Sequence, residues 1–138
     1  MKIIEVIAKI AVVAGDVWQG PQHLLGFIIK KILEKKKRIV EVLAFKEADV
    51  YKIAGAFGGI SLGRFIFLSE SQYQFDKTVK HEIGHSKQSK MLGWFYLLSV
   101  GIASGSMNIL TRLKILKPET YYMRWPENWA DKLGGVDR

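Results

Sequence analysis

Two histidines and a glutamate near the middle of the chain have the types and spacing of a metal site. His81 and His85 are four residues apart. Residues at this spacing project from one face of an α-helix, so both rings can reach a single ion. Glu82 follows His81 directly and would lie beside that ion, where its carboxylate can take a proton from an attacking water. The HExxH pattern therefore predicts a helix that carries two metal ligands and a general base.

A second acidic pair, Glu127 and Asp131, begins 42 positions after His85 and has ExxxD spacing. A catalytic zinc site uses three protein ligands, drawn from nitrogen, sulfur and carboxylate donors, and leaves its fourth position to water. The two histidines are one ligand short, and we expect Glu127 to supply the third. Asp131, one helical turn later, can accept the outer N–H of a ligating histidine and so fix its tautomer.

Local signals place both motifs on helices. In the stretch 75–89, Phe75, Val79 and Ile83 repeat every four residues, as on the apolar stripe of a helix. A short helix is predicted after Pro126, and Gly134 with its glycine neighbour would end it. Without a metal, the two histidines would be surface or core-edge residues and the two acids would be solvated.

With ExxxD behind it, the HExxH stretch resembles the gluzincin group of zinc metallopeptidases, of which thermolysin is the familiar member. In detail, residues 78–89 and 127–135 are similar to short bacterial HExxH proteins. The resemblance implies Zn²⁺ as the cofactor and hydrolysis of a peptide or protein substrate. It assigns the ligand, base and histidine-orienting roles to the same five side chains: His81, His85, Glu127, Glu82 and Asp131.

The chain departs from this family in the groups that would stabilise the oxyanion. Larger gluzincins bring a histidine and a tyrosine to that position, whereas the one remaining histidine here is His23, far upstream. Tyr122 is our candidate for a catalytic role of this kind, with Tyr121 and Arg124 as alternatives. We expect His23 to be structural or solvated.

The resemblance also implies a fold. We expect one α+β domain over residues 1–138, with a minimal zincin-like core in 39–138 in which a small, mainly antiparallel sheet packs on the active-site helix. Strands are predicted at 39–45 and 65–68, with a further candidate at 50–53. By resemblance, the run 61–68 would be an edge strand that pairs with extended peptide substrates. The alternative is an ordinary buried strand.

Residues 1–38 form an apolar and basic segment with the pattern of two helices. Gly20 and Pro21 separate the helices, and the second ends in four consecutive basic residues at 35–38. Each apolar stretch is too short to span a bilayer. Two arrangements remain: a hairpin lying on an anionic membrane surface, or a helix pair buried against the sheet.

The stretch 91–110 has twenty residues and no charge, between Lys90 and Arg112, which is the length of a membrane-spanning helix. One crossing here would place Glu127 on the opposite side of the membrane from His85. We therefore expect 94–107 to form a buried helix or a hairpin that dips part-way into lipid.

Composition limits the remaining functions. The chain has no cysteine, which excludes disulfides and thiolate zinc sites. Its net charge of +8 would suit nucleic acid, but no nucleic-acid motif accompanies it, so we do not favour that partner. The N-terminus lacks the pattern of a cleaved signal peptide, and we expect a cytoplasmic protein, peripheral on the inner membrane face. Two functions are retained: a zinc-dependent peptidase, and a non-catalytic, zinc-stabilised, membrane-associated interaction protein.

Overall fold

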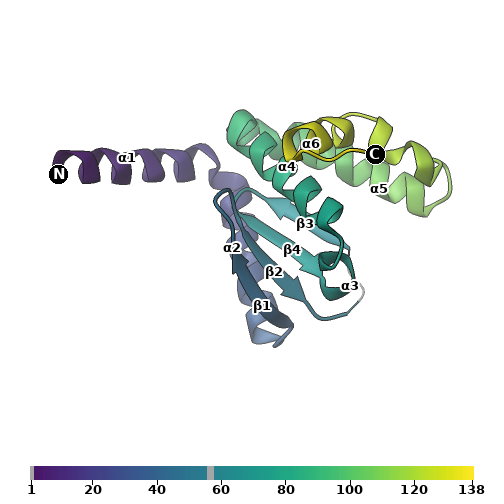
Figure 1. Cartoon of the computed structure of the whole chain (residues 1–138), viewed down its shortest axis with the longest axis horizontal. Helices are drawn as coiled ribbons and strands as arrows, with labels where there is room; N and C mark the ends of the chain where they lie inside the picture. Colours follow the sequence, from purple (N-terminus) through teal and green to yellow (C-terminus); the bar gives the residue numbers. More distant parts are fainter. Residues whose placement is uncertain (1, 56–57) are drawn as a thin grey trace.

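The computed structural model describes residues 2–55 and 58–138 and shows an α+β fold (Figure 1). Two helices come first, α1 (Lys2–Trp18) and α2 (Gly20–Lys35). The strands are β1 (Ile39–Ala44), β2 (Asp49–Ile53), β3 (Gly59–Leu62) and β4 (Phe65–Ser69). The later helices are α3 (Glu70–Tyr73), α4 (Asp76–Leu92), α5 (Ile102–Arg112) and α6 (Glu127–Gly134). Shorter helical turns connect them: η1 (Gly93–Phe95), η2 (Leu97–Gly101) and η3 (Pro118–Met123).

The four strands form one mixed sheet in the order β1-β2-β4-β3. β1 pairs antiparallel with β2, and β3 pairs antiparallel with β4, whereas β2 and β4 run parallel. The expected mainly antiparallel sheet therefore contains one parallel pairing at its centre. A parallel pair needs a long connection, and here the chain from β2 to β4 includes the edge strand β3.

The run 61–68 is not a single strand, so that prediction is wrong. Gly63, with a φ of +66°, lies in the left-handed region that favours glycine, and the chain reverses there between β3 and β4. β3 lies at an edge of the sheet and β4 lies inside it. The first half of the run is therefore an edge strand and the second half is a buried strand, which were the two alternatives expected for the whole run.

Apolar side chains cover both faces of the sheet. On one face, Val50, Ile66 and Leu68 pack with Val79 of α4. On the other, Tyr51, Ile53 and Phe67 form a cluster against which the α2 side chains Ile29 and Leu33 pack. The sheet therefore lies between α2 and α4, and the face that carries α4 is the one that positions the metal-site motif.

The two N-terminal helices differ in their packing. α2 lies so close to the sheet that a Cβ on Gly26 would lie 2.7 Å from the ring of Phe65. α1 has no buried residue and extends away from the rest of the molecule (Figure 1). Burial against the sheet is thus confirmed for α2 and wrong for α1.

The apolar stretch after α4 turns sharply. The helical segments 76–95 and 97–112 are bent relative to each other by 111°. Among the described residues, no single helix is long and apolar enough to cross a membrane. The two segments of this bent pair reach the required length and apolar composition only when they are taken together. Of the two arrangements expected for 94–107, the buried helix is wrong for most of the stretch. Tyr96 and Val100 are buried, but α5 has no buried residue and Trp94, Phe95 and Leu98 are more than half exposed.

Candidate metal centre

Helix α4 carries the HExxH motif and lies across the sheet. Val79 is buried in the core and Ile83 packs against it, as the apolar stripe predicted. Phe75 does not belong to this stripe, because it precedes the first turn of the helix and is 52% exposed. His81 and His85 are buried even though they lie off the apolar stripe, because helix α6 packs on their side of α4.

Two glycines allow the backbones of α4 and α6 to approach closely. A Cβ on Gly84, the glycine of the HEIGH sequence, would overlap the carbonyl oxygen of Ala130 in α6. A Cβ on Gly134 would likewise overlap the carbonyl oxygen of Lys80 in α4. Any larger residue at either position would push the helices apart. This close contact holds the ExxxD motif of α6 against the HExxH motif of α4.

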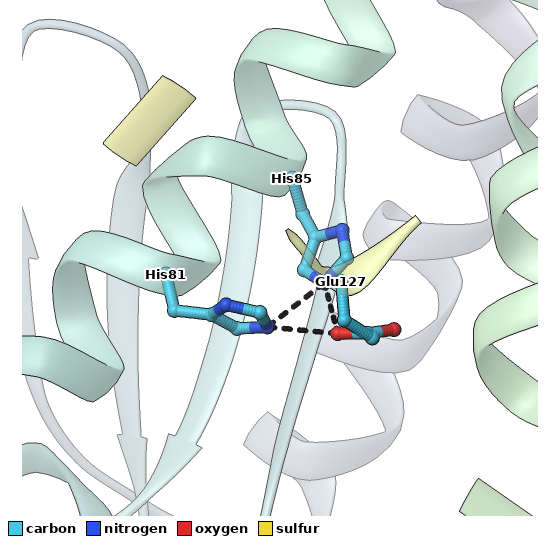
Figure 2. Close-up of side chains that lie close together, drawn as sticks. All are labelled: His81, His85 and Glu127. Atoms are coloured by element: carbon cyan, nitrogen blue, oxygen red, sulfur yellow. Dashed lines mark hydrogen bonds and ion pairs between the residues drawn. The ribbon is translucent and has the colours of Figure 1, made fainter. Parts of the chain in front are cut away.

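The three expected ligands converge on one point. The Oε2 atom of Glu127 lies 2.9 Å from Nε2 of His81 and 3.2 Å from Nε2 of His85, and the two Nε2 atoms are 3.1 Å apart (Figure 2). Four ligands about 2.1 Å from a tetrahedral zinc ion lie roughly 3.4 Å from one another. The observed triangle is slightly smaller than one face of that tetrahedron, so a zinc ion fits above it with little movement.

The outer ring nitrogens of both histidines are tied by hydrogen bonds. The amide nitrogen of Gln88 donates to the carbonyl of Pro126, so its Oε1 faces Nδ1 of His85 at 2.7 Å and requires a proton there. Nδ1 of His81 donates to the carboxylate of Asp131, also at 2.7 Å. The Nε2 atoms are therefore left with their lone pairs directed at the cluster. This is the tautomer that metal binding requires.

Without a cation, three electron-rich atoms would face one another in a buried space. Glu127 is fully buried, and no residue in the described part of the chain hydrogen-bonds to its Oε1 atom. Burial alone would raise the pKa of Glu127, but when the cluster holds a proton the hydrogen bonds that His81 and His85 then donate to its carboxylate outweigh burial and hold that pKa far below its usual range. Burial lowers the pKa of His85, yet the hydrogen bond to Glu127 and the neighbouring carboxylates raise it overall. The cluster thus favours a positive charge at its centre, which a proton or a metal ion can supply.

Glu82 lies beside this cluster. It is buried, and its side chain faces β3, where a Cβ on Gly59 would lie 2.7 Å from Oε1 of Glu82. Burial raises the pKa of Glu82 above that of an ordinary glutamate, although the nearby histidines partly oppose the shift. The hydroxyl of Ser61 donates to the backbone carbonyl of Glu82 and ties β3 to α4. The predicted base is thus held between the edge strand and the ligands.

Of the three candidates for oxyanion stabilisation, Tyr122 lies against a ligand. Its ring meets His81 edge to face with 5.1 Å between centroids. Burial raises the pKa of Tyr122, which keeps the hydroxyl protonated and able to donate. Tyr121 packs against Tyr122, and burial raises its pKa to about 12. The side chain of Arg124 is exposed and makes no hydrogen bond or ion pair with any described residue.

Two residues of the site were missed from the sequence. Gln88 is three positions after His85, and this helical spacing was a signal that could have identified it. Arg138 donates to both oxygens of Asp131, at 2.7 and 3.3 Å, and its guanidinium lies 3.5 Å from the centre of the Tyr122 ring. No local pattern pointed to Arg138.

His23 is structural, as expected. Its Nε2 accepts the backbone N–H of Arg64 at 3.2 Å, and its Nδ1 lies 3.3 Å from the carboxylate of Asp16. These contacts connect α1, α2 and the turn between β3 and β4. His23 is not a member of the three-residue cluster.

Comparisons of the chain with protein-family models, with curated proteins and with solved structures find no match. The chemistry of the site is therefore inferred from its residues.

Proposed function

We propose that the chain is a zinc-dependent peptidase. The observation that carries the proposal is the convergence of two Nε2 atoms and one carboxylate oxygen within a triangle of 2.9, 3.1 and 3.2 Å. Two imidazoles and a carboxylate form a donor set that suits zinc, whereas calcium and magnesium prefer oxygen ligands. The cluster of His, Cys, Asp and Glu side chains found in the described residues has three members, which leaves a fourth zinc position for water.

The neighbouring side chains suit peptide hydrolysis. Zinc, when bound, lowers the pKa of a water molecule and polarises the scissile carbonyl. Glu82 is the base that takes a proton from the attacking water and gives it to the leaving nitrogen. Burial raises its pKa, which makes the carboxylate a stronger base towards the attacking water. Tyr122 is the candidate donor to the developing oxyanion because it lies against His81.

The substrate would bind in extended form along β3. This strand lies at the sheet edge and packs against α4, so added main chain there would lie beside Glu82. At the other end of the strand, the carbonyl of Ser61 already accepts a hydrogen bond of 2.9 Å from the hydroxyl of Tyr96, so it is not free to pair with a substrate. We therefore place substrate pairing at the Gly59–Ile60 end of the strand.

A second candidate is a non-catalytic module that zinc stabilises and that acts as a membrane-associated interaction protein. The observation that favours it is the burial of the cluster, since His81 and His85 are only 4% and 6% exposed. A metal held there would tie α4 to α6, because the ligands come from both helices. In this candidate the ion contributes free energy of folding and no turnover.

The Glu82→Gln variant distinguishes the two candidates. Removing the base should leave zinc content unchanged and lower the rate of peptide hydrolysis by about 10²–10⁴-fold. Hydrolysis of a quenched-fluorescence peptide mixture would be measured beside zinc content by elemental mass spectrometry. Glu119→Gln is the matched control, because Glu119 is exposed and lies outside the cluster.

Unchanged hydrolysis by the Glu82→Gln variant would contradict the proposed mechanism. A wild-type protein that binds one zinc, unfolds at a lower temperature when the zinc is removed and cleaves no peptide would support the second candidate.

A further inference from the structure

Helix α1 presents an almost entirely apolar surface to solvent. Its charged residues gather on one narrow side, and the remaining roughly three quarters of the circumference is apolar at 3.6 residues per turn. The large aliphatic residues of this surface are all more than half exposed: Ile3, Ile4, Val6, Ile7, Ile10, Val12, Val13 and Val17. A helix that is apolar on most sides is stable when it is surrounded, either by a large core or by lipid.

The end of α1 joins a second exposed apolar region. The indole N–H of Trp94 donates to the carbonyl of Val17 at 2.7 Å, and that of Trp18 donates to the carbonyl of Lys90 at 2.9 Å. From this junction, exposed apolar side chains continue from the end of α4 through η1 and η2 into α5: Met91, Trp94, Phe95, Leu98, Ile102 and Ile109. These residues and those of α1 form what we call the α1–α5 surface. Its two parts are connected through hydrogen-bonded tryptophans, a residue type enriched where protein meets the membrane interface.

The charges along the η1, η2 and α5 part of this surface are of one sign. From Ile83 to Pro118 the chain contains no acidic residue. Four exposed cations flank the apolar stretch, and none of them forms an ion pair with another described residue: Lys90, Arg112, Lys114 and Lys117. Basic residues at the border of an apolar surface are attracted to anionic lipid headgroups.

We propose that the α1–α5 surface docks on an anionic lipid bilayer. The apolar side chains of α1 and α5 enter the headgroup and acyl boundary, and the flanking cations contact the headgroups. A second copy of the chain suits this surface less well, because one packed helix covers a single side of α1 and leaves the rest in water. Lipid can surround the whole apolar part of the helix. This docking is independent of the metal site.

Vesicle flotation of the full-length protein tests the proposal. Vesicles of phosphatidylcholine alone are compared with vesicles that contain one quarter phosphatidylglycerol. We expect partitioning into the anionic vesicles to exceed that into the neutral vesicles by at least about tenfold. The double variant Ile7→Ser/Ile10→Ser should lower partitioning by about tenfold or more, because two apolar side chains leave the lipid boundary.

The matched control is Val40→Thr/Val42→Thr. Both valines are about half exposed on β1, outside the α1–α5 surface, and should not affect partitioning. Because all four altered side chains are exposed, thermal unfolding should confirm that both double variants fold. Equal partitioning into neutral and anionic vesicles, or an unchanged Ile7→Ser/Ile10→Ser variant, would overturn the proposal. A protein that does not bind vesicles, and that forms a dimer in the wild type but not in the Ile7→Ser/Ile10→Ser variant, would also overturn the proposal, because the surface would then bind a second copy.

Discussion

Replacing Gly84 by alanine tests how the site is assembled without altering any proposed ligand. The added Cβ would overlap the carbonyl oxygen of Ala130 and lie 2.7 Å from its carbonyl carbon. Ordinary contact between two carbon atoms begins at about 3.5 Å, so α6 would have to move away from α4 by roughly 1 Å. The obstacle is backbone, which cannot rotate aside as a flexible side chain can.

Such a displacement would carry Glu127 and Asp131 away from the histidines of α4. Metal–ligand distances tolerate changes of only about 0.2 Å, so we expect zinc affinity to fall by at least about 100-fold. Overpacking of this kind also costs about 1–3 kcal/mol of stability. For a chain of this length that lowers the Tm by roughly 4–12 °C.

Zinc affinity would be measured by competition with a chromogenic chelator, and stability by thermal unfolding of the metal-free protein. Gly105→Ala in α5 is the control, because a Cβ there meets nothing within 4 Å. The control should bind zinc normally and gain up to about 1 kcal/mol of stability. A Gly84→Ala protein with wild-type affinity and Tm would refute the close packing of α4 on α6 as the basis of the site.

Three further predictions concern the residues around the ligands. Asp131→Asn should lower zinc affinity by about 10–100-fold in the same chelator assay, because the carboxylate that orients His81 is lost. Gln88→Ala should lower zinc affinity by about 10-fold or more and destabilise the fold by about 1–3 kcal/mol, since it frees the His85 ring and leaves its buried Nδ1–H without an acceptor. Zinc affinity should also depend on pH. The pKa of His85 is raised above its ordinary 6.5, and protonated imidazole does not bind metal, so affinity should fall roughly tenfold per pH unit below that raised value and level off above it. An affinity that stays constant from pH 8 to pH 5 would contradict this assignment.

The local part of the site could be predicted from the sequence, because helical spacing determines it. His81 and His85 lie on one face of α4, and Asp131 lies one turn after Glu127 on α6. These relations need only the geometry of a single helix. The convergence of the two helices is a tertiary property, and the two glycines that permit it have no distinctive pattern in the sequence.

The errors in the fold predicted from the sequence have related causes. The turn at Gly63 lies within a run of strand-forming residues, and the parallel pairing of β2 with β4 joins segments that are not consecutive strands. The stretch 94–107 has the composition of a buried helix, yet the structure buries Tyr96 and Val100 and leaves most of its other large apolar side chains exposed. The composition of a segment shows how much apolar surface it could bury. Whether the other elements cover that surface depends on how they are arranged in the fold. The contact between Arg138 and Asp131 depends on the path of the chain beyond α6 and could not be read from spacing.

The most direct test of the central claim is the metal content of the purified protein, measured by elemental mass spectrometry for the wild type and the His85→Ala variant. The three-ligand site predicts about one zinc per wild-type chain and none in the variant, which loses one of its two nitrogen donors. A wild type without metal after zinc is supplied, or a fully metallated variant, would contradict it.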